Sequence, residues 1–89
     1  MYQKSSDVLT QKNEAEIVLH NMNSDSFYSL CDVSVEIWEC IERKLSRNEI
    51  LRRIVNKYRI PPELAITDLD FFINELQEEK LIDVLSIED

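Results

Sequence analysis

The 89-residue chain contains no glycine, two prolines, two cysteines and one histidine. Without glycine it cannot build the loops that cradle phosphate groups, because those loops rely on glycine's backbone freedom. Turns must be made by Asn, Asp, Ser and Pro instead. Cys31 and Cys40 form neither a disulfide framework nor the paired spacing of a zinc site. We therefore expect two reduced thiols, no metal and no cofactor.

Long apolar runs and positive charge are also scarce. No run approaches the roughly 18 residues of a membrane span, and residues 1–10 lack the apolar segment of a secretory signal. Ten Lys and Arg stand against eighteen Asp and Glu, for a net charge of −8. This balance repels nucleic acid, since binding it requires Lys and Arg to displace counterions. We expect a soluble cytoplasmic protein whose partners are neutral or basic.

What is present suffices for one small domain. Hydrophobic residues make up 44% of the sequence, and a chain of this size buries only about 60–65% of its unfolded surface. One modest core fits, with little room for a closed active site. We expect a single domain over residues 1–89, with its core at about 8–85 and polar tails at 1–7 and 86–89.

The stretch Ser26–Ile41 organises the rest. It begins with a strand pattern over Ser26–Leu30, in which aromatic and apolar residues are frequent. Alternation puts Tyr28 and Leu30 on one face of that strand and Phe27 and Ser29 on the other. If this strand lies at a sheet edge, its free backbone groups can pair with another chain, either an extended peptide or a second copy in a homodimer.

A helix over 34–42 follows directly, and we expect Ser34 to cap it. Its apolar residues recur at the spacing of a buried stripe, formed by Val33, Ile37, Trp38 and Ile41. The single tryptophan marks the densest part of the core.

The remaining patterns place strands before this stretch and helices after it. Val8–Thr10 and Glu16–Met22 read as strands, the second forming an antiparallel hairpin with Ser26–Leu30. Ser46 and Glu49 have the spacing of a capping box, which opens a second helix. A third helix covers Pro62–Lys80, and Leu81–Leu85 is either a short edge strand or a loosely packed end. The order β-β-β-α-α-α also contains the helix pair of a helix-turn-helix.

The third helix has two faces at 100° per residue. Its core face comprises Ala65, Ile66, Leu69, Ile73 and Leu76, with Phe72 at the margin. The opposite face comprises Leu64, Asp68, Phe71 and Glu75. An aromatic between two acids is typical of an exposed binding surface. Burial of the helix on two sides, or a lone surface Phe, is the other interpretation.

Four segments, in order and spacing, match one family: FYSL at 27–30, IW at 37–38, LSRNEILRRIVNKY at 45–58 and DLDFFINELQEEKLI at 68–82. From Glu16 to Asp83 the chain resembles the coenzyme PQQ synthesis protein D (PqqD-like) family, also called the RiPP precursor peptide recognition element. It departs from the family at positions that often hold glycine, where this chain has Arg43-Lys44 and Lys80.

The resemblance implies an α+β fold like a winged helix-turn-helix, with a three-stranded antiparallel sheet packed on a three-helix bundle. It also implies a module without catalysis, in which the leader region of a ribosomally made precursor adds beside the third strand, in a cleft against the third helix. The partner enzyme would be a radical SAM enzyme, a cyclase or a leader peptidase. Carried over by position, and completed by the helical-face argument for Phe71 and Glu75, the peptide-binding candidates are Phe27, Tyr28, Ser29, Leu30, Asp68, Phe71, Phe72 and Glu75.

Two other functions remain. A winged-helix DNA-binding transcriptional regulator shares the helix order, and its basic character would come from Arg47, Arg52, Arg53 and Lys57. An enzyme would need a positioned partner for His20, and the sequence indicates none.

Overall fold

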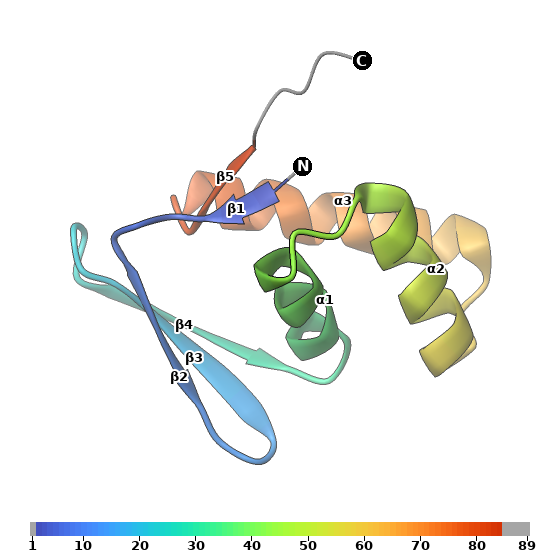
Figure 1. The fold of residues 1–89 in the computed structure, drawn as a ribbon, viewed down its shortest axis with the longest axis horizontal. Coiled ribbons are helices and arrows are strands. Elements are labelled where there is room, and N and C mark those ends of the chain that lie inside the picture. The colour runs from blue at the N-terminus through green and yellow to red at the C-terminus, as the bar shows by residue number, and fades with distance from the viewer. Residues whose placement is uncertain (1, 85–89) are drawn as a thin grey trace.

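The computed structural model describes residues 2–84. In Figure 1 the strands within residues 8–31 lie on one side and the three helices on the other, while the short strands near the two ends of the chain lie beside the helices. The elements along the chain are β1 (Tyr2–Lys4), β2 (Val8–Lys12), β3 (Glu16–Asn21), β4 (Ser26–Cys31), α1 (Val33–Glu42), α2 (Arg47–Tyr58), α3 (Pro62–Glu78) and β5 (Ile82–Val84). The expected α+β class, with a three-stranded antiparallel sheet and three helices, is confirmed.

The three-stranded sheet has the order β2-β3-β4, so β4 pairs only with β3 in the described part of the chain. Asparagines close both hairpins without glycine. The Asn13 side-chain oxygen accepts bonds from the N–H groups of Ala15 and Glu16, and Asn21 does the same for Asn23 and Ser24. Hydrogen bonds from the turn backbone to asparagine side chains therefore stabilise these two turns without glycine.

The N-terminal segment corrects one prediction. Residues 1–7 were expected to be a polar tail, but Tyr2–Lys4 pairs antiparallel with Ile82–Val84, and Tyr2 is buried. The short C-terminal strand gives Tyr2–Lys4 a hydrogen-bonding partner, and the Tyr2 ring adds to the core. Residues 85–89, including the expected tail at 86–89, lie outside the described residues.

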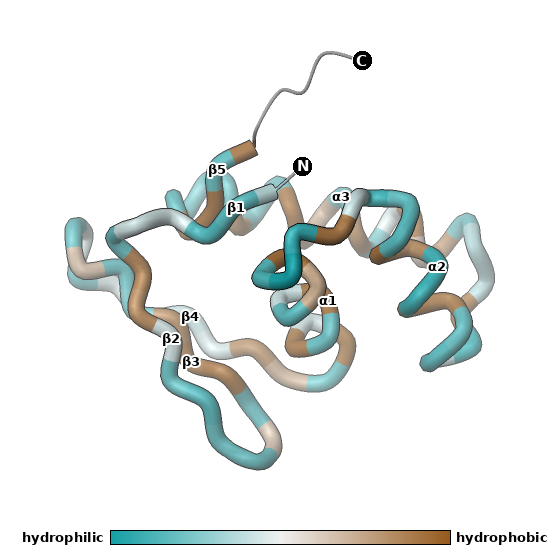
Figure 2. The backbone as a smooth tube through the Cα atoms, viewed as in Figure 1, coloured by the Kyte–Doolittle hydropathy of each residue, from teal (hydrophilic) through white to brown (hydrophobic). Residues whose placement is uncertain are grey.

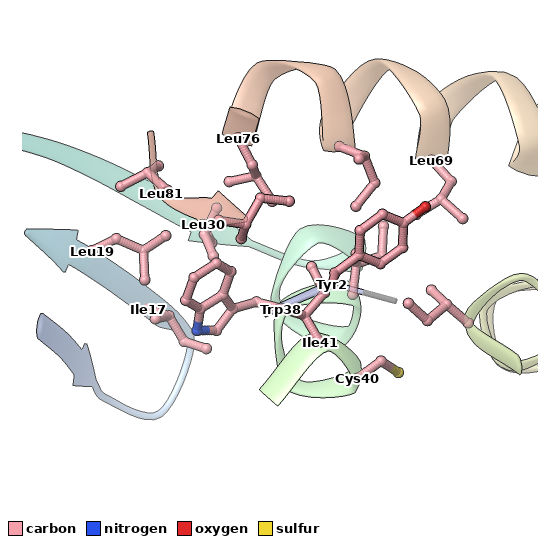
Figure 3. Packing of buried hydrophobic residues seen from close by; sticks show 14 of the residues in the cluster. Tyr2, Ile17, Leu19, Leu30, Trp38, Cys40, Ile41, Leu69, Leu76 and Leu81 are labelled. Carbon is pink, nitrogen blue, oxygen red and sulfur yellow. The ribbon is translucent and has the colours of Figure 1, made fainter. Parts of the chain in front are cut away.

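The core lies between the inner face of the sheet and the three helices. Trp38 is completely buried, and Figure 3 shows its indole on the side of α1 that faces Ile17, Leu19 and Leu30. Hydrophobic and hydrophilic positions alternate along α2 and α3 in Figure 2, as amphipathic helices require. The inner side chains of β3 and β4 and the predicted stripe of α1 thus meet in one core.

The helix ends differ in part from expectation. The capping box of Ser46 and Glu49 is present in both directions, as predicted. Ser34 does not cap α1: Asp32 is the N-cap, and the Ser34 hydroxyl bonds the backbone of Cys31 instead. The third helix ends at Glu78 rather than Lys80, because Lys80 takes a positive φ of 57° that no α-helix contains.

One predicted core residue of α3 is wrong. Ile66 is 41% exposed, whereas Ala65, Leu69, Ile73 and Leu76 are buried as expected. Ile66 lines a cavity of about 370 Å³ between α2 and α3, together with Leu51 and Val55. The core face predicted for α3 therefore extended too far toward α2, because it included Ile66.

Ion pairs tie the helices to one another. Glu36 is buried on α1, and its carboxylate accepts bonds from Arg53 Nε at 3.1 Å and Lys57 Nζ at 2.6 Å. Arg47 binds Asp70 on α3, with Nη2 2.7 Å from Oδ1. The bond to Lys57 lowers the pKa of Glu36 despite its burial. Three of the cations considered for DNA binding, Arg47, Arg53 and Lys57, thus help to hold the bundle together.

Because the chain lacks glycine, other residues occupy its left-handed backbone positions. Asp25, Asp32, Lys44, Arg59 and Lys80 all have positive φ. Lys44 and Lys80 lie where the family often has glycine. This chain therefore has the left-handed backbone that favours glycine at these two positions, but with lysine in its place. Asp32 is the most strained of these, because its ψ of −125° with φ of 55° is a region where glycine is favoured.

We predict that Asp32→Gly stabilises the protein by about 1 kcal/mol, since relief of strain outweighs the extra freedom of the unfolded chain. The Asp32 side chain makes no capping bond that would be lost. Chemical denaturation measures the change. Asn56→Gly, at an exposed position inside α2, is the matched control and should destabilise by somewhat less than 1 kcal/mol. A loss of stability in Asp32→Gly would contradict the strain.

We predict that Glu36→Gln lowers the free energy of unfolding at pH 7 by about 1–3 kcal/mol, because hydrogen bonds to charged partners are lost. A carboxylate whose pKa is lowered in the folded state contributes stability above its unfolded pKa of about 4.3 and loses it as pH falls through the lower folded value. The variant should therefore lose less stability below about pH 4.3 than the wild type does. Glu39→Gln, on a half-exposed neighbour, is the control; equal acid sensitivity of wild type and Glu36→Gln would refute this.

Candidate functional site

The free side of β4 is the first component of the site. The backbone N–H and C=O groups of successive residues point to opposite sides of a strand. Two hydrogen bonds just beyond the ends of the β2–β3 pair therefore show which residues of β3 point toward β2. Met22 N–H donates to Asp7 C=O at 2.8 Å, and Glu16 C=O accepts from Asn13 N–H at 3.0 Å. Even-numbered residues of β3 therefore face β2, and its odd-numbered residues face β4.

The register of the β3–β4 pair carries this pattern onto β4. Leu19 lies opposite Tyr28 and Ile17 opposite Leu30, so these pairs exchange hydrogen bonds. The backbone N–H and C=O groups of Phe27 and Ser29 then point away from β3, toward the open edge. Among the described residues no hydrogen bond to them is found.

The open edge has a defined end. The Ser34 hydroxyl accepts a bond from Cys31 N–H at 2.9 Å and donates to Cys31 C=O at 2.7 Å. These are the next backbone groups along β4 on the open side, and Ser34 occupies both. The unpaired stretch is thus confined to Phe27 and Ser29.

The second component is one face of α3, joined to β4 by a side-chain bond. The Tyr28 hydroxyl donates to Glu75 Oε1. Burial, followed by this bond, raises the pKa of Tyr28 to about 12. The phenol therefore stays protonated at physiological pH and remains a donor to the carboxylate. This bond sets the side of α3 that faces β4.

Phe71 and Asp68 lie one and two turns before Glu75 on the same side of α3. Phe71 is 67% exposed, which excludes burial of α3 on two sides and leaves two interpretations, a binding surface and a lone surface Phe. Leu64, half-exposed, continues the stripe toward the start of the helix. Phe72 is partly buried and packs against the core.

The eight candidate residues are thus divided among three places. Tyr28 bonds to Glu75, and Asp68 and Phe71 lie on the same side of α3 as Glu75, while Phe72 packs against the core. Phe27 and Ser29 offer backbone at the edge, but their side chains lie on the outer sheet face. Leu30 is 1% exposed, so its side chain belongs to the core.

Sequence reasoning missed two contributors. Ser34 ends the open edge by bonding Cys31, whereas the sequence had assigned its hydroxyl to the cap of α1. His20 stacks on Phe27, with ring centroids 4.3 Å apart, and its Nε2 lies 2.9 Å from Asp25 Oδ1. The expectation that His20 has no positioned partner is therefore wrong. The hairpin register, which sets His20 opposite Phe27, was the available signal.

Residues 2–84 offer little for a metal site, a membrane span or a DNA-binding surface. No group of three His, Cys, Asp or Glu side chains there is placed to hold a metal ion. No helix in that range has the length and apolar content to cross a membrane. Of the four α2 cations considered for DNA binding, Arg47, Arg53 and Lys57 are paired with carboxylates. This leaves less free positive charge than the sequence suggested.

Two solved structures share the fold. TbiB1 in complex with the TbiA(beta) leader peptide has a TM-score of 0.89 at 22% identity, covering 96% of this chain and 99% of its own. Lasso peptide synthetase B1 complexed with the leader peptide has a TM-score of 0.86 at 14% identity, covering 93% and 98%.

No curated protein matches the sequence. The family model described as coenzyme PQQ synthesis protein D (PqqD) matches residues 16–82. That match covers β3 through the start of β5, and so includes both β4 and α3. The chain therefore belongs to the PqqD family.

Proposed function

We propose that this domain binds the leader region of a ribosomally made precursor peptide and presents it to a partner enzyme, without chemistry of its own. The observation that carries the proposal is the open edge of β4, where the backbone groups of Phe27 and Ser29 face away from β3. An extended peptide can add there as a further strand, because main-chain bonds supply affinity and neighbouring side chains supply specificity.

The similar structures support this proposal. Both have the same fold, and both are complexes with a leader peptide. In TbiB1 nearly the whole chain is matched, 99% of its length.

The surface beside the edge suggests the character of the peptide. Asp68 and Glu75 are acidic and suit a basic residue in the leader, consistent with the net charge of −8. Phe71 and Phe72 would contact an apolar one. Tyr28 orients Glu75, and Leu30 anchors the strand in the core. The peptide would therefore be extended, with basic and apolar side chains turned toward α3.

The partner enzyme would be a radical SAM enzyme, a cyclase or a leader peptidase. A cytoplasmic location follows from the proposal, because precursors are made on ribosomes there. The same edge can pair with a second copy, so a homodimer would compete with the leader. The alternative of a DNA-binding regulator gains no support from the family or the similar structures.

We predict that Phe71→Ala and Asp68→Lys each weaken peptide binding by roughly ten- to a hundredfold, as loss of a residue that carries much of the binding energy does. The probes are synthetic peptides covering the N-terminal halves of short reading frames beside the gene, titrated by calorimetry. The thermal midpoint should hardly change, because Phe71 and Asp68 are exposed. Trp38→Ala is the contrast, with destabilisation of about 3–5 kcal/mol. A large loss of stability in Phe71→Ala would mean that the residue is structural.

We predict that Ser29→Pro abolishes binding of the same peptides while the domain stays folded. Proline removes the outward N–H and is tolerated only where a strand's N–H is not needed by the sheet. Thr10→Pro is the matched control: by the same alternation, the Thr10 N–H faces the free side of β2, the opposite edge. Undiminished binding by Ser29→Pro would rule out strand addition at β4.

A further inference from the structure

The outer face of the three-stranded sheet carries a row of side chains that runs across all three strands. Leu9 lies opposite His20, and His20 lies opposite Phe27. Leu9 and Phe27 are 54% and 68% exposed, so nothing in the described chain covers the two ends. The row begins on β2 and stops at Phe27, on the open edge.

The rings of this row already stack at the spacing of the strands. The ring planes of His20 and Phe27 form an angle of 5°, and their centroids are 4.3 Å apart. That distance is close to the roughly 4.8 Å between neighbouring strands. His20 covers one face of the Phe27 ring. Since β4 has no neighbour beyond it among residues 2–84, the other face of that ring is turned toward the place of an added strand.

Backbone direction distinguishes the two ends of the row. Leu9 exchanges hydrogen bonds with His20, because even-numbered residues of β3 face β2, so its backbone is not available at the β2 edge. The backbone of Phe27 is available at the β4 edge. A strand anchored there places the residue opposite Phe27 on the outer face, since directly opposite residues share a face of a sheet.

We propose that the peptide residue opposite Phe27 is aromatic and stacks on the free face of the Phe27 ring, as the fourth member of the row. This inference rests on the proposed function and specifies the peptide class: an extended segment with an aromatic residue on the outer face, flanked by residues that face α3. Stacked rings at this spacing add affinity beyond the area they bury. Phe27 is then a specificity-determining residue, although its side chain faces away from α3.

Two other occupants of the outer sheet face would make different contacts with it. A hollow of about 340 Å³ lies over it, lined by Leu9, Val18, His20 and Phe27 among others. A protein that covered the whole face would fill this hollow and contact Leu9 as much as Phe27. A second copy of the chain would instead pair its own β4 with this one and stack Phe27 on Phe27.

The test selects random dodecapeptides, displayed on their own mRNA, for binding to the immobilised full-length domain. We expect the enriched sequences to share one aromatic position. Replacing that aromatic by Ala should weaken binding to the wild type by about tenfold, and to Phe27→Ser by less than about twofold. Phe27→Leu, which keeps an apolar contact and loses the stack, should lie between them. Leu9→Ser should change affinity by less than about twofold, and circular dichroism checks that each variant folds.

Each other result overturns the inference. Enriched peptides that lose affinity in Ser29→Pro, but contain no aromatic coupled to Phe27, would remove the inference and leave the proposed function standing. Equal losses in Leu9→Ser and Phe27→Ser would indicate a partner over the whole face. A dimer in sedimentation velocity that Phe27→Ser dissociates would indicate a second copy. If no peptide is enriched, the proposed function falls, and the inference falls with it.

Discussion

The structure depends on one constraint: β4 is held by β3 at one edge and by the core and α3 on its inner face, while its other edge is free. β3 pairs with one side of its backbone, and the core takes the Leu30 side chain. The Tyr28–Glu75 bond fixes its distance from α3. What remains is a short length of backbone, at Phe27 and Ser29, to which no other residue in the described part of the chain is hydrogen-bonded. Such an edge invites pairing with other chains, and here Ser34 limits it at one end.

The rest of the fold serves to hold that strand in place. Trp38 and its neighbours fill the space behind the sheet, and Glu36 draws α1 and α2 together. Asn21 joins the β3–β4 turn to the end of α3, donating to the carbonyls of Glu79 and Lys80 at 3.3 and 3.2 Å. The sheet and α3 are therefore fastened at two points, the turn and the Tyr28–Glu75 bond, with the candidate surface alongside. The absence of glycine fits such a scaffold, because each positive-φ position keeps a side chain and restricts the unfolded chain.

Local patterns predicted most of this fold. The capping box, the hairpin, the core stripe of α1 and the exposed Phe71 all follow from spacing within one element. The errors came from contacts between distant segments. Tyr2 lies in a strand that pairs with the distant residues 82–84, and Ile66 is exposed because α2 leaves a cavity beside it. For the candidate site, the sequence proposed a set of residues, through the family resemblance and the two faces of α3. Alternation put Phe27 and Tyr28 on opposite faces of their strand, but the sequence did not show that the Tyr28 face meets Glu75 of α3, or that Ser34 closes the edge.

The central claim is that β4 is open at Phe27 and Ser29, and amide hydrogen exchange followed by NMR tests it most directly. In the free protein the amides of Phe27 and Ser29 should exchange rapidly, while those of Tyr28 and Leu30, bonded to β3, should be protected. On saturation with a bound leader peptide, the Phe27 and Ser29 amides should become protected as well. Uniform protection of all four in the free protein, or continued fast exchange at Phe27 and Ser29 in the complex, would contradict the account.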